Sequence, residues 1–566
     1  MHPLLQIKNL SVDFKTESEA ISAIKNVSFE LNKGEIVAIV GESGSGKTVT
    51  SLSILQLLPT PPAVYKNGEI LFSKNGDQQN DLLKLTPEQL IDIRGNEIAM
   101  IFQEPMTSLN PVQTCGSQVV EAMLAHKHLS KTLARQNTVA LFKQVDLSDS
   151  SINAYPHQLS GGQKQRVIIA MAMSCNPSIL IADEPTTALD VIVQKKILQL
   201  IKDLQRQNNM GVIYITHDLG LVAEIADKII VMYKGAIVES GTVQNIFTQA
   251  EHPYTKALLA CRPILYEKHR RLAVVSDFMQ QKAAGAMIQS SHDNKSKEFL
   301  NAPKVLLEVK NLKVYFLKKN FWGKTVKQFK AVDDVSFTIQ KGETIGLAGE
   351  SGCGKTTLGR TLTRMIEPTS GQIFFEGRDI AHIPKEEMRR LRKKIQIIFQ
   401  DPYGSLNPRM TIGGAIEEPL KVHSLLKSNR QRREKVIELL EKVDLKPEHF
   451  NRYPHEFSGG QRQRICIARA LGLSPEFIIC DESVSALDVS VQAQVLNLLN
   501  DLKKEFGFTT IFISHDLNVV RYLSDRIIIM NKGRIEESGI AEDIWLRPEK
   551  EYTKKLIAAI PGAAIV

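Results

Sequence analysis

The feature that most constrains this chain is a phosphate-binding pattern that occurs twice. Residues 41–48 read Gly-Glu-Ser-Gly-Ser-Gly-Lys-Thr, and residues 349–356 read Gly-Glu-Ser-Gly-Cys-Gly-Lys-Thr. In G-x-x-x-x-G-K-[ST], glycines let backbone N–H groups curl around a phosphate chain, the lysine reaches the outer phosphates and the hydroxyl binds Mg²⁺. Each copy follows a short apolar stretch typical of a buried strand and precedes helix-forming residues. The repeat therefore predicts two nucleoside triphosphate sites.

The candidate ligands in these loops are the glycines, serines, lysines and threonines, and the threonines are also candidate Mg²⁺ ligands. They are Gly41, Ser43, Gly44, Gly46, Lys47 and Thr48 in the first copy and Gly349, Ser351, Gly352, Gly354, Lys355 and Thr356 in the second.

Length and composition favour two globular domains. The chain has 566 residues, of which 43% are hydrophobic and 23% charged, and a formal net charge of +9. No apolar run approaches the roughly 18 residues that span a bilayer, and the first residues lack a signal peptide's basic start and apolar middle, so we expect a cytosolic protein. The six cysteines lack the C-x-x-C spacing of zinc sites. The net charge does not choose among nucleotides, nucleic acid and an anionic membrane face.

The two halves begin alike, with alternating apolar residues at 4–14 and 306–316 that predict half-buried strands. We expect a first domain over residues 1–262, a polar linker over 263–304 and a second domain over 305–566. Phe14 and Phe316 occupy matching places, where an aromatic ring either stacks on a nucleobase or belongs to the core; Tyr315 rivals Phe316 for the stacking role.

A glutamine follows a short apolar strand in each half and opens a proline-bounded loop. Gln103 and Gln400 are candidates to ligate Mg²⁺ or to hold a water while the loop moves. The alternative is a turn residue capped by its own amide. The loops at 103–110 and 400–407 are nearly identical, which favours a functional role, and we expect them to couple nucleotide binding to a partner through Met106 and Tyr403.

A Ser-Gly-Gly-Gln motif precedes a predicted helix in each half. Clustered N–H donors and the positive end of a helix dipole there can bind an anion. An N-cap alone would explain the serine but would not explain two glycines and a glutamine. The candidate anion-binding residues are Ser160, Gly161, Gly162 and Gln163 in the first half and Ser458, Gly459, Gly460 and Gln461 in the second.

Paired acids end an apolar strand in each half, and a histidine ends another. Such a strand lifts Asp183 or Asp481 to Mg²⁺ and leaves Glu184 or Glu482 facing the attacking water as a base or water-orienting group. A histidine at this position is often structural. At the same sheet edge as the acids, however, His217 and His515 can contact a γ-phosphate.

The ordered motifs resemble the ATP-binding-cassette (ABC) family over almost the whole chain. The resemblance implies an α/β fold with two tandem P-loop NTPase domains, each with a mainly parallel core sheet, an antiparallel β subdomain and a helical subdomain. It implies ATP and Mg²⁺ as cofactors and two cassettes that meet head to tail. One site would then pair Lys47, Asp183, Glu184 and His217 with residues 458–461, and the other Lys355, Asp481, Glu482 and His515 with residues 160–163.

More narrowly, the glutamine loops and the tail beginning His252-Pro253-Tyr254-Thr255 resemble bacterial di- and oligopeptide importer ATPases, here with two subunits fused. This implies an ATP-hydrolysing, energy-coupling subunit at the cytoplasmic face of the inner membrane. Its partners would be two integral-membrane permease subunits and, through them, an extracytoplasmic solute-binding protein, with no nucleic acid. The solute stays open among peptides, glutathione, nickel chelates and peptide-like antibiotics.

The alternative function is a soluble tandem-cassette ATPase that acts on ribosomes or nucleic acid. Such proteins tend to carry a long, charged, helical arm between their cassettes, whereas this linker is short and polar.

The two phosphate loops differ in one chemically important residue, which is Ser45 in the first loop and Cys353 in the second. Among N–H donors and beside Lys355, the Cys353 thiol is expected to have a depressed pKa and to react as thiolate, unless it is merely a small packing residue.

Overall fold

The protein is described by a computed structural model covering residues 2–15, 19–74, 76, 78–103, 108–187, 189–263, 270–279, 304–319, 325–485 and 487–560. It divides into two compact units, one ending at Leu259 and the other running from Ala260 to Ile560. Within the described residues, no helix combines the length and the apolar character that crossing a membrane requires.

A six-stranded sheet forms the centre of the first unit. Its strand order is β10-β9-β3-β8-β7-β6, and every neighbouring pair is parallel except β10 with β9. Strands β3, β7 and β8 are buried along their whole length, as expected of β-branched runs covered on both faces. The strands are β3 (Ile36–Val40), β6 (Ile98–Ile101), β7 (Ile179–Asp183), β8 (Gly211–Thr216), β9 (Lys228–Tyr233) and β10 (Ala236–Thr242).

An antiparallel sheet of order β2-β1-β4-β5 packs beside this centre. Apolar residues of β1, β2 and β4 share one core cluster with β3 and β7, so the antiparallel layer covers part of the parallel sheet. Its strands are β1 (Leu5–Lys15), β2 (Ala20–Leu31), β4 (Ala63–Phe72) and β5 (Asn80–Asp81).

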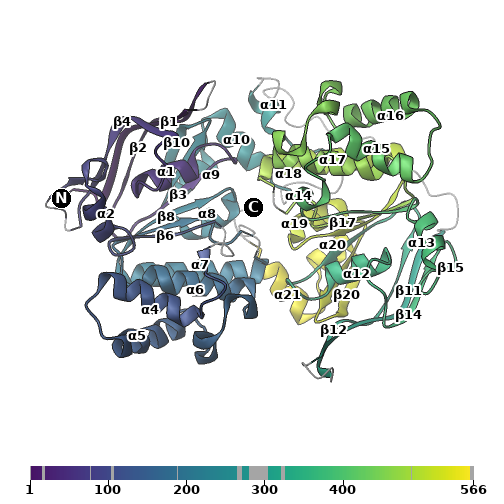
Figure 1. Cartoon of the computed structure of the whole chain (residues 1–566), viewed down its shortest axis with the longest axis horizontal. Helices are drawn as coiled ribbons and strands as arrows, with labels where there is room; N and C mark the ends of the chain where they lie inside the picture. Colours follow the sequence, from purple (N-terminus) through teal and green to yellow (C-terminus); the bar gives the residue numbers. More distant parts are fainter. Residues whose placement is uncertain are drawn as a thin grey trace. The chain divides into compact units, whose positions relative to one another are not determined.

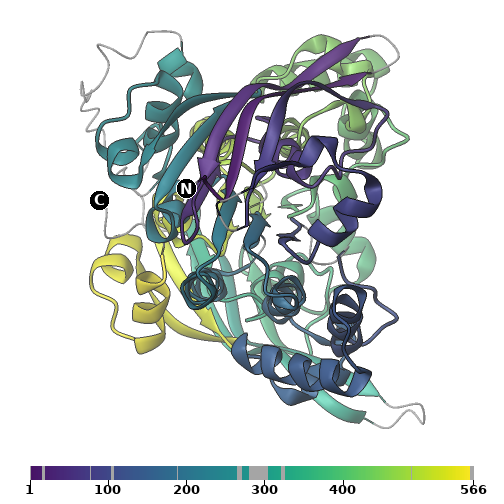
Figure 2. The ribbon, with the colours of Figure 1, turned by 90° about the vertical axis from the view of Figure 1, so that its left-hand side faces the viewer.

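Helices of the first unit form a second core at the far end from the antiparallel strands. Views from two directions place the purple strands β1 and β2 and the blue helices α4 and α5 at opposite ends of this unit (Figure 1, Figure 2). Helices α4 to α7 pack around Phe142 and Val167. The helices are α1 (Lys47–Ile54), α2 (Pro87–Ile93), α4 (Cys115–His126), α5 (Lys131–Gln144), α6 (Gly161–Met173), α7 (Val191–Asn208), α8 (Leu219–Ile225), α9 (Val243–Thr248) and α10 (Pro253–Ala260).

The second unit repeats this plan with sheets of order β12-β11-β14-β15 and β16-β17-β18-β13-β19-β20. The predicted fold class is confirmed. Its strands are β11 (Val305–Lys319), β12 (Thr325–Gln340), β13 (Thr344–Ala348), β14 (Ser370–Phe375), β15 (Arg378–Asp379), β16 (Ile395–Ile398), β17 (Phe477–Asp481), β18 (Thr509–Ile513), β19 (Arg526–Asn531) and β20 (Arg534–Ile540). Its helices are α12 (Lys355–Leu362), α13 (Lys385–Leu391), α14 (Pro402–Ser405), α15 (Ile412–Val422), α16 (Asn429–Lys442), α17 (Gly459–Leu471), α18 (Val489–Phe506), α19 (Leu517–Leu523), α20 (Ala541–Leu546) and α21 (Glu551–Ala558).

Part of the predicted linker packs on the second unit. Asn497 on α18 accepts a hydrogen bond from the Leu272 N–H and donates one to the Leu272 carbonyl, each at 2.9 Å. The Tyr522 hydroxyl donates to the Arg270 carbonyl at 2.7 Å, and helix α11 (Val275–Met279) follows. Residues 264–269 and 280–303 lie outside the described residues, and the domain boundaries stay a prediction.

Candidate active site

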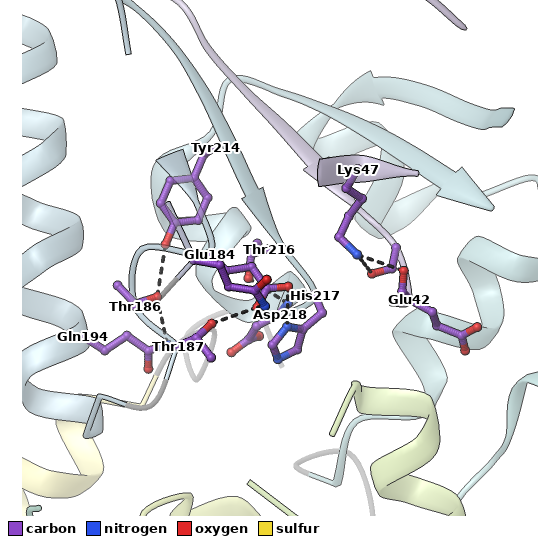
Figure 3. A network of polar contacts seen from close by, with 12 residues as sticks. Glu42, Lys47, Glu184, Thr186, Thr187, Gln194, Tyr214, Thr216, His217 and Asp218 are labelled. Carbon is purple, nitrogen blue, oxygen red and sulfur yellow. Dashed lines mark hydrogen bonds and ion pairs between the residues drawn. The ribbon is translucent and has the colours of Figure 1, made fainter. Parts of the chain in front are cut away.

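Each phosphate loop connects a buried strand to a helix through glycines with left-handed backbone. Gly46 ends the first loop with φ 99° directly before α1, and a Cβ on Gly41 would lie 2.3 Å from the Met232 carbonyl oxygen. The Lys47 ammonium folds back and donates to the carbonyls of Gly41 and Glu42 at 2.8 and 2.9 Å (Figure 3). Lys355 makes the same two contacts in the second unit, at 2.7 and 2.9 Å. The loops are thus built around their lysines.

The aspartates lie at the carboxyl ends of β7 and β17, close to the loop threonines. Burial raises the pKa of Asp183 to about 6, and the neighbouring Glu184 charge adds to this while Thr48 opposes it. Burial raises the Asp481 pKa as well, and Thr356 donates to this carboxylate at 2.9 Å. Asp183 Oδ1 is buried and has no hydrogen-bond partner among the described residues. A threonine hydroxyl and an unsatisfied buried carboxylate oxygen fit Mg²⁺, which binds oxygen ligands.

The next acid of the first unit is held by three donors. Glu184 has φ 47°, a left-handed conformation that side chains other than glycine seldom adopt. Its carboxylate lies 3.2 Å from His217 Nδ1 and accepts from the Thr187 hydroxyl at 2.9 Å (Figure 3) and from the Gln103 amide at 3.1 Å. Burial disfavours its charge, but His217 and Thr187 outweigh burial and lower the pKa of Glu184 to about 2. Glu184 is therefore an ionised acceptor aimed at the site.

The second unit has the same arrangement with one donor fewer. Glu482 has φ 48°, accepts from the Gln400 amide at 2.8 Å and lies 3.5 Å from His515 Nδ1. Burial opposes its ionisation, but the His515 contact lowers its pKa. The Ser485 hydroxyl, in the place of Thr187, donates to the Glu482 backbone carbonyl at 2.9 Å rather than to the carboxylate. The two catalytic candidates are therefore held differently.

A separate polar network joins Thr186, two residues after Glu184, to β8 and α7 of the first unit. Thr186 Oγ1 lies 3.3 Å from the Tyr214 hydroxyl, and the Gln194 amide donates to Thr186 at 3.3 Å (Figure 3). Val484 and Phe512 occupy the corresponding positions of the second unit and carry no polar group for such a network. Sequence reasoning missed this difference, although the exchange of Thr-Thr for Val-Ser after the paired acids was a readable signal.

Both glutamines thus contact the candidate catalytic acids through their amide nitrogens. The Nε2 atoms donate to Glu184 and Glu482, which leaves each Oε1 atom as the oxygen that could meet a cation or a water. A turn residue capped by its own amide does not describe Gln103 or Gln400.

The Ser-Gly-Gly-Gln motifs cap helices α6 and α17, and capping explains more of them than expected. Ser160 accepts from the Gln163 N–H at 3.3 Å, and the Gln163 side chain accepts from the Ser160 N–H at 3.0 Å. The same capping box joins Ser458 to Gln461 at 3.3 and 3.1 Å. The glutamines therefore have a local structural role, contrary to our expectation that an N-cap would not explain them.

The second glycine of each motif also has a packing reason. A Cβ on Gly162 would lie 2.5 Å from Val193 Cγ1, and one on Gly460 would lie 2.2 Å from Val491 Cγ1. The first glycines have room, because the nearest atoms would lie 3.4 Å from a Cβ on Gly161 and 3.8 Å from one on Gly459. Only the first glycine is left without a structural explanation.

The candidate stacking rings differ between the units. Phe14 is partly buried and packs against the core of the antiparallel sheet, whereas Phe316 is 45% exposed. The Tyr315 hydroxyl donates to Asp333, and the Lys330 ammonium lies 5.3 Å from the Tyr315 ring centre. Phe316 is therefore the more accessible ring.

The expectation of an activated thiol at Cys353 is wrong. The side chain turns inward beneath the loop, where it is 6% exposed and belongs to the core of the second unit. Burial raises the pKa of Cys353, and this outweighs the opposing effect of Lys355, whose ammonium lies 3.8 Å from Sγ. The sequence placed the thiol among N–H donors but did not reveal which side of the loop it faces.

Comparison with known proteins decides the family. A model described as "ABC transporter" matches residues 24–187 and 332–485. The chain belongs to the ATP-binding-cassette transporter family. A model described as "Oligopeptide/dipeptide transporter, C-terminal region" matches residues 238–283. This family member binds and hydrolyses ATP and works with membrane permease subunits.

Relatives match over nearly the full length. The chain is 47% identical to the glutathione import ATP-binding protein GsiA of Escherichia coli (strain K12), over 99% of this chain and 90% of that protein. It is 46% identical to the protein of that name from Pectobacterium atrosepticum, over the same shares. Among solved structures it is similar to the ATP-binding cassette MJ0796 in a dimeric post-hydrolysis state bound to ADP and Pi (30% identity, 42% of this chain, 98% of that chain, TM-score 0.38). The importer interpretation is confirmed, and the soluble ribosome or nucleic-acid alternative gains no support.

Proposed function

We propose that this protein couples ATP hydrolysis to the import of a small peptide-like solute, with glutathione and short peptides as the leading candidates. The glutathione-import relatives and the oligopeptide/dipeptide transporter region support this solute class. The observation that carries the proposal is the duplicated acid: each unit sets a glutamate on a left-handed backbone between a glutamine and a histidine. The proposal assigns one cassette to residues 1–262, one to 305–566 and a linker to 263–304.

The proposal places one ATP on each phosphate loop. Lys47 would exchange its two carbonyl contacts for phosphate oxygens, and the signature residues 458–461 of the other cassette would close the site. Lys355 and residues 160–163 would form the second site. Mg²⁺ would be held by Thr48, Asp183 and Gln103 in one site and by Thr356, Asp481 and Gln400 in the other, and when bound it would neutralise charge on the β- and γ-phosphates.

The glutamates would orient the attacking water and accept its proton. Glu184 is ionised and fixed by its neighbours, so its remaining acceptor site can accept from a water in line with the γ-phosphate. In its doubly protonated form, His217 beside it would donate to the γ-phosphate from Nε2 while Nδ1 donates to Glu184. Glu482 and His515 would act alike in the second site.

Permease subunits would dock beside the glutamine loops. In the second unit, Tyr403 is 61% exposed on α14 and its ring lies 3.5 Å from the Arg462 guanidinium carbon. Nearby, a groove of about 630 Å³ opens between β16, α15 and α17, with Ser405 and Arg469 in its lining. Met106, the matching position of the first unit, lies outside the described residues. The proposal puts the protein at the cytoplasmic face of the bacterial inner membrane, on two permeases fed by an extracytoplasmic solute-binding protein.

The test is uptake into right-side-out proteoliposomes. They carry the permease subunits with the full chain on the inside and the solute-binding protein on the outside. Labelled glutathione, a dipeptide, a pentapeptide and a nickel chelate are supplied in turn, with ATP inside. We expect ATP-dependent uptake of glutathione or a peptide, abolished by Lys47→Ala with Lys355→Ala. Uptake of the nickel chelate alone would refute the solute class, and co-purification with ribosomes instead of permeases would refute transport.

A further inference from the structure

The C-terminal tail of each cassette contacts that cassette's own phosphate loop. The Tyr254 hydroxyl on α10 accepts a hydrogen bond from the Glu42 N–H at 3.0 Å. In the second unit, the Tyr552 hydroxyl on α21 accepts from the Glu350 N–H at 3.2 Å. Glu42 and Glu350 are the second residues of the two loops. The same contact thus occurs twice, although the tails share little beyond Tyr-Thr-Lys.

A partly buried glutamate carboxylate fixes the tail helix in both units. Glu239 on β10 accepts from the N–H groups that lead into α10, those of Glu251 at 2.8 Å and His252 at 3.1 Å. Glu537 on β20 accepts in the same way from residues 549 and 550, at 2.8 and 3.2 Å. N–H groups at a helix start need such acceptors, so the strand sets where the helix begins and where its tyrosine points.

His252 and Pro253, at the start of the first tail helix, also help to position Tyr254. His252 Nδ1 accepts from the Tyr254 N–H at 3.1 Å, and Pro253 begins the helix, where the missing N–H costs nothing. The Tyr254 ring is fully buried, with its centre 4.2 Å from that of Tyr233 at the end of β9. A buried ring with a fixed hydroxyl is a rigid support for the loop.

The Glu42 backbone is thereby held through both its carbonyl and its N–H group. The Glu42 carbonyl accepts from Lys47 and its N–H donates to Tyr254. If Lys47 turns to a phosphate, as proposed above, the carbonyl contact would be lost and the tyrosine contact would remain. We propose that Tyr254 and Tyr552 are positioning residues that hold the phosphate loops in their nucleotide-binding shape, and that this is a function of the tail helix. The proposal rests on the assignment of these loops as ATP sites.

Removing only the hydroxyl tests this proposal. The variant Tyr254→Phe in a Lys355→Ala background isolates the first site, and Tyr552→Phe with Lys47→Ala isolates the second. A hydrogen bond to a backbone N–H contributes about 1 kcal/mol, which is about fivefold in an equilibrium constant. We expect fluorescent MgATP-analogue binding to weaken about fivefold in each variant. In the double Phe variant, KM for ATP should rise by a similar factor while kcat at saturating ATP changes less than twofold.

Tyr522→Phe is the matched control, since that buried hydroxyl donates to the Arg270 carbonyl and accepts from the Asn500 amide. It should lower Tm without changing ATP affinity or KM. Hydrogen exchange gives a readout independent of nucleotide: the Glu42 amide should exchange faster in Tyr254→Phe and at its normal rate in Tyr522→Phe.

Two outcomes separate the claims. Unchanged ATP affinity and unchanged Glu42 exchange in Tyr254→Phe, with only Tm lowered, would reduce the tyrosine to a tail anchor and overturn the inference. Intact nucleotide binding at the first site in Lys47→Ala would instead overturn the assignment of the loop.

Discussion

The two glycines of the second Ser-Gly-Gly-Gln motif should cause different defects when each is changed to alanine. A Cβ on Gly460 would lie 2.2 Å from Val491 Cγ1, whereas one on Gly459 would meet its nearest atom at 3.8 Å. Carbon atoms pack best at about 3.5–4.0 Å, so Gly460→Ala forces α17 and α18 apart by roughly 1.5 Å if no side chain moves.

The magnitude follows from two opposing effects. Overpacking of this kind costs about 1–3 kcal/mol, and the better helix propensity of alanine returns up to about 1 kcal/mol. Gly460→Ala should therefore lower the free energy of unfolding by about 1–2 kcal/mol, which corresponds to a Tm roughly 2–4 °C lower for a unit of this size. Gly459→Ala should leave Tm unchanged or slightly higher. Its defect should appear in ATP hydrolysis, since a methyl group there would crowd the N–H donors that we propose contact a phosphate.

Calorimetric unfolding and steady-state ATPase assays of both variants measure these effects. Val491→Ala added to Gly460→Ala should recover about 1–2 kcal/mol relative to the sum of the single changes, because it removes the clashing methyl group. Equal Tm losses for the two glycine variants, or additive behaviour of Gly460→Ala with Val491→Ala, would refute this account of the motif.

Three further predictions concern chemistry and coupling. The double change Glu184→Gln with Glu482→Gln should retain ATP binding and lower kcat by roughly 10²–10⁴; rapid multi-turnover hydrolysis would exclude these acids as the water-orienting groups. Burial raises the pKa of Cys353, so the thiol is protonated at neutral pH and its alkylation should be slow and should accelerate as pH rises beyond 9. Mass spectrometry with Cys353→Ser as control measures this, and fast labelling at pH 7 would contradict it. Tyr403→Asp should impair solute uptake or permease assembly more than ATP binding, and normal uptake would exclude this docking surface.

Much of the fold could be predicted from local sequence. Apolar runs ending in Asp183 or Asp481 lie on buried parallel strands, because a strand covered on both faces needs a continuous apolar sequence and polar side chains can follow only at its end. The duplication then predicted a second, equal architecture.

What could not be predicted depends on contacts between distant residues or on which way a side chain turns. Tyr254 meets Glu42 across more than two hundred residues, and no local pattern encodes that meeting. Thr187 and Ser485 occupy equivalent places with similar hydroxyls, yet one bonds a carboxylate and the other a backbone carbonyl. Cys353 shows the same limit, since the sequence does not tell whether a side chain of the loop faces the phosphate or the core.

The pairing of Leu272 with Asn497 determines where this fused chain can be divided into separate cassettes. Asn497 is 5% exposed and its amide bonds both the N–H and the carbonyl of Leu272. A gene split beyond Met279 would remove both Leu272 groups from the second polypeptide and leave the buried Asn497 amide unsatisfied, at about 1–3 kcal/mol for each lost partner. A split at residue 262 would keep residues 270–279 with the cassette on which they pack, so the second half should be expressed with this stretch as its own N-terminal extension.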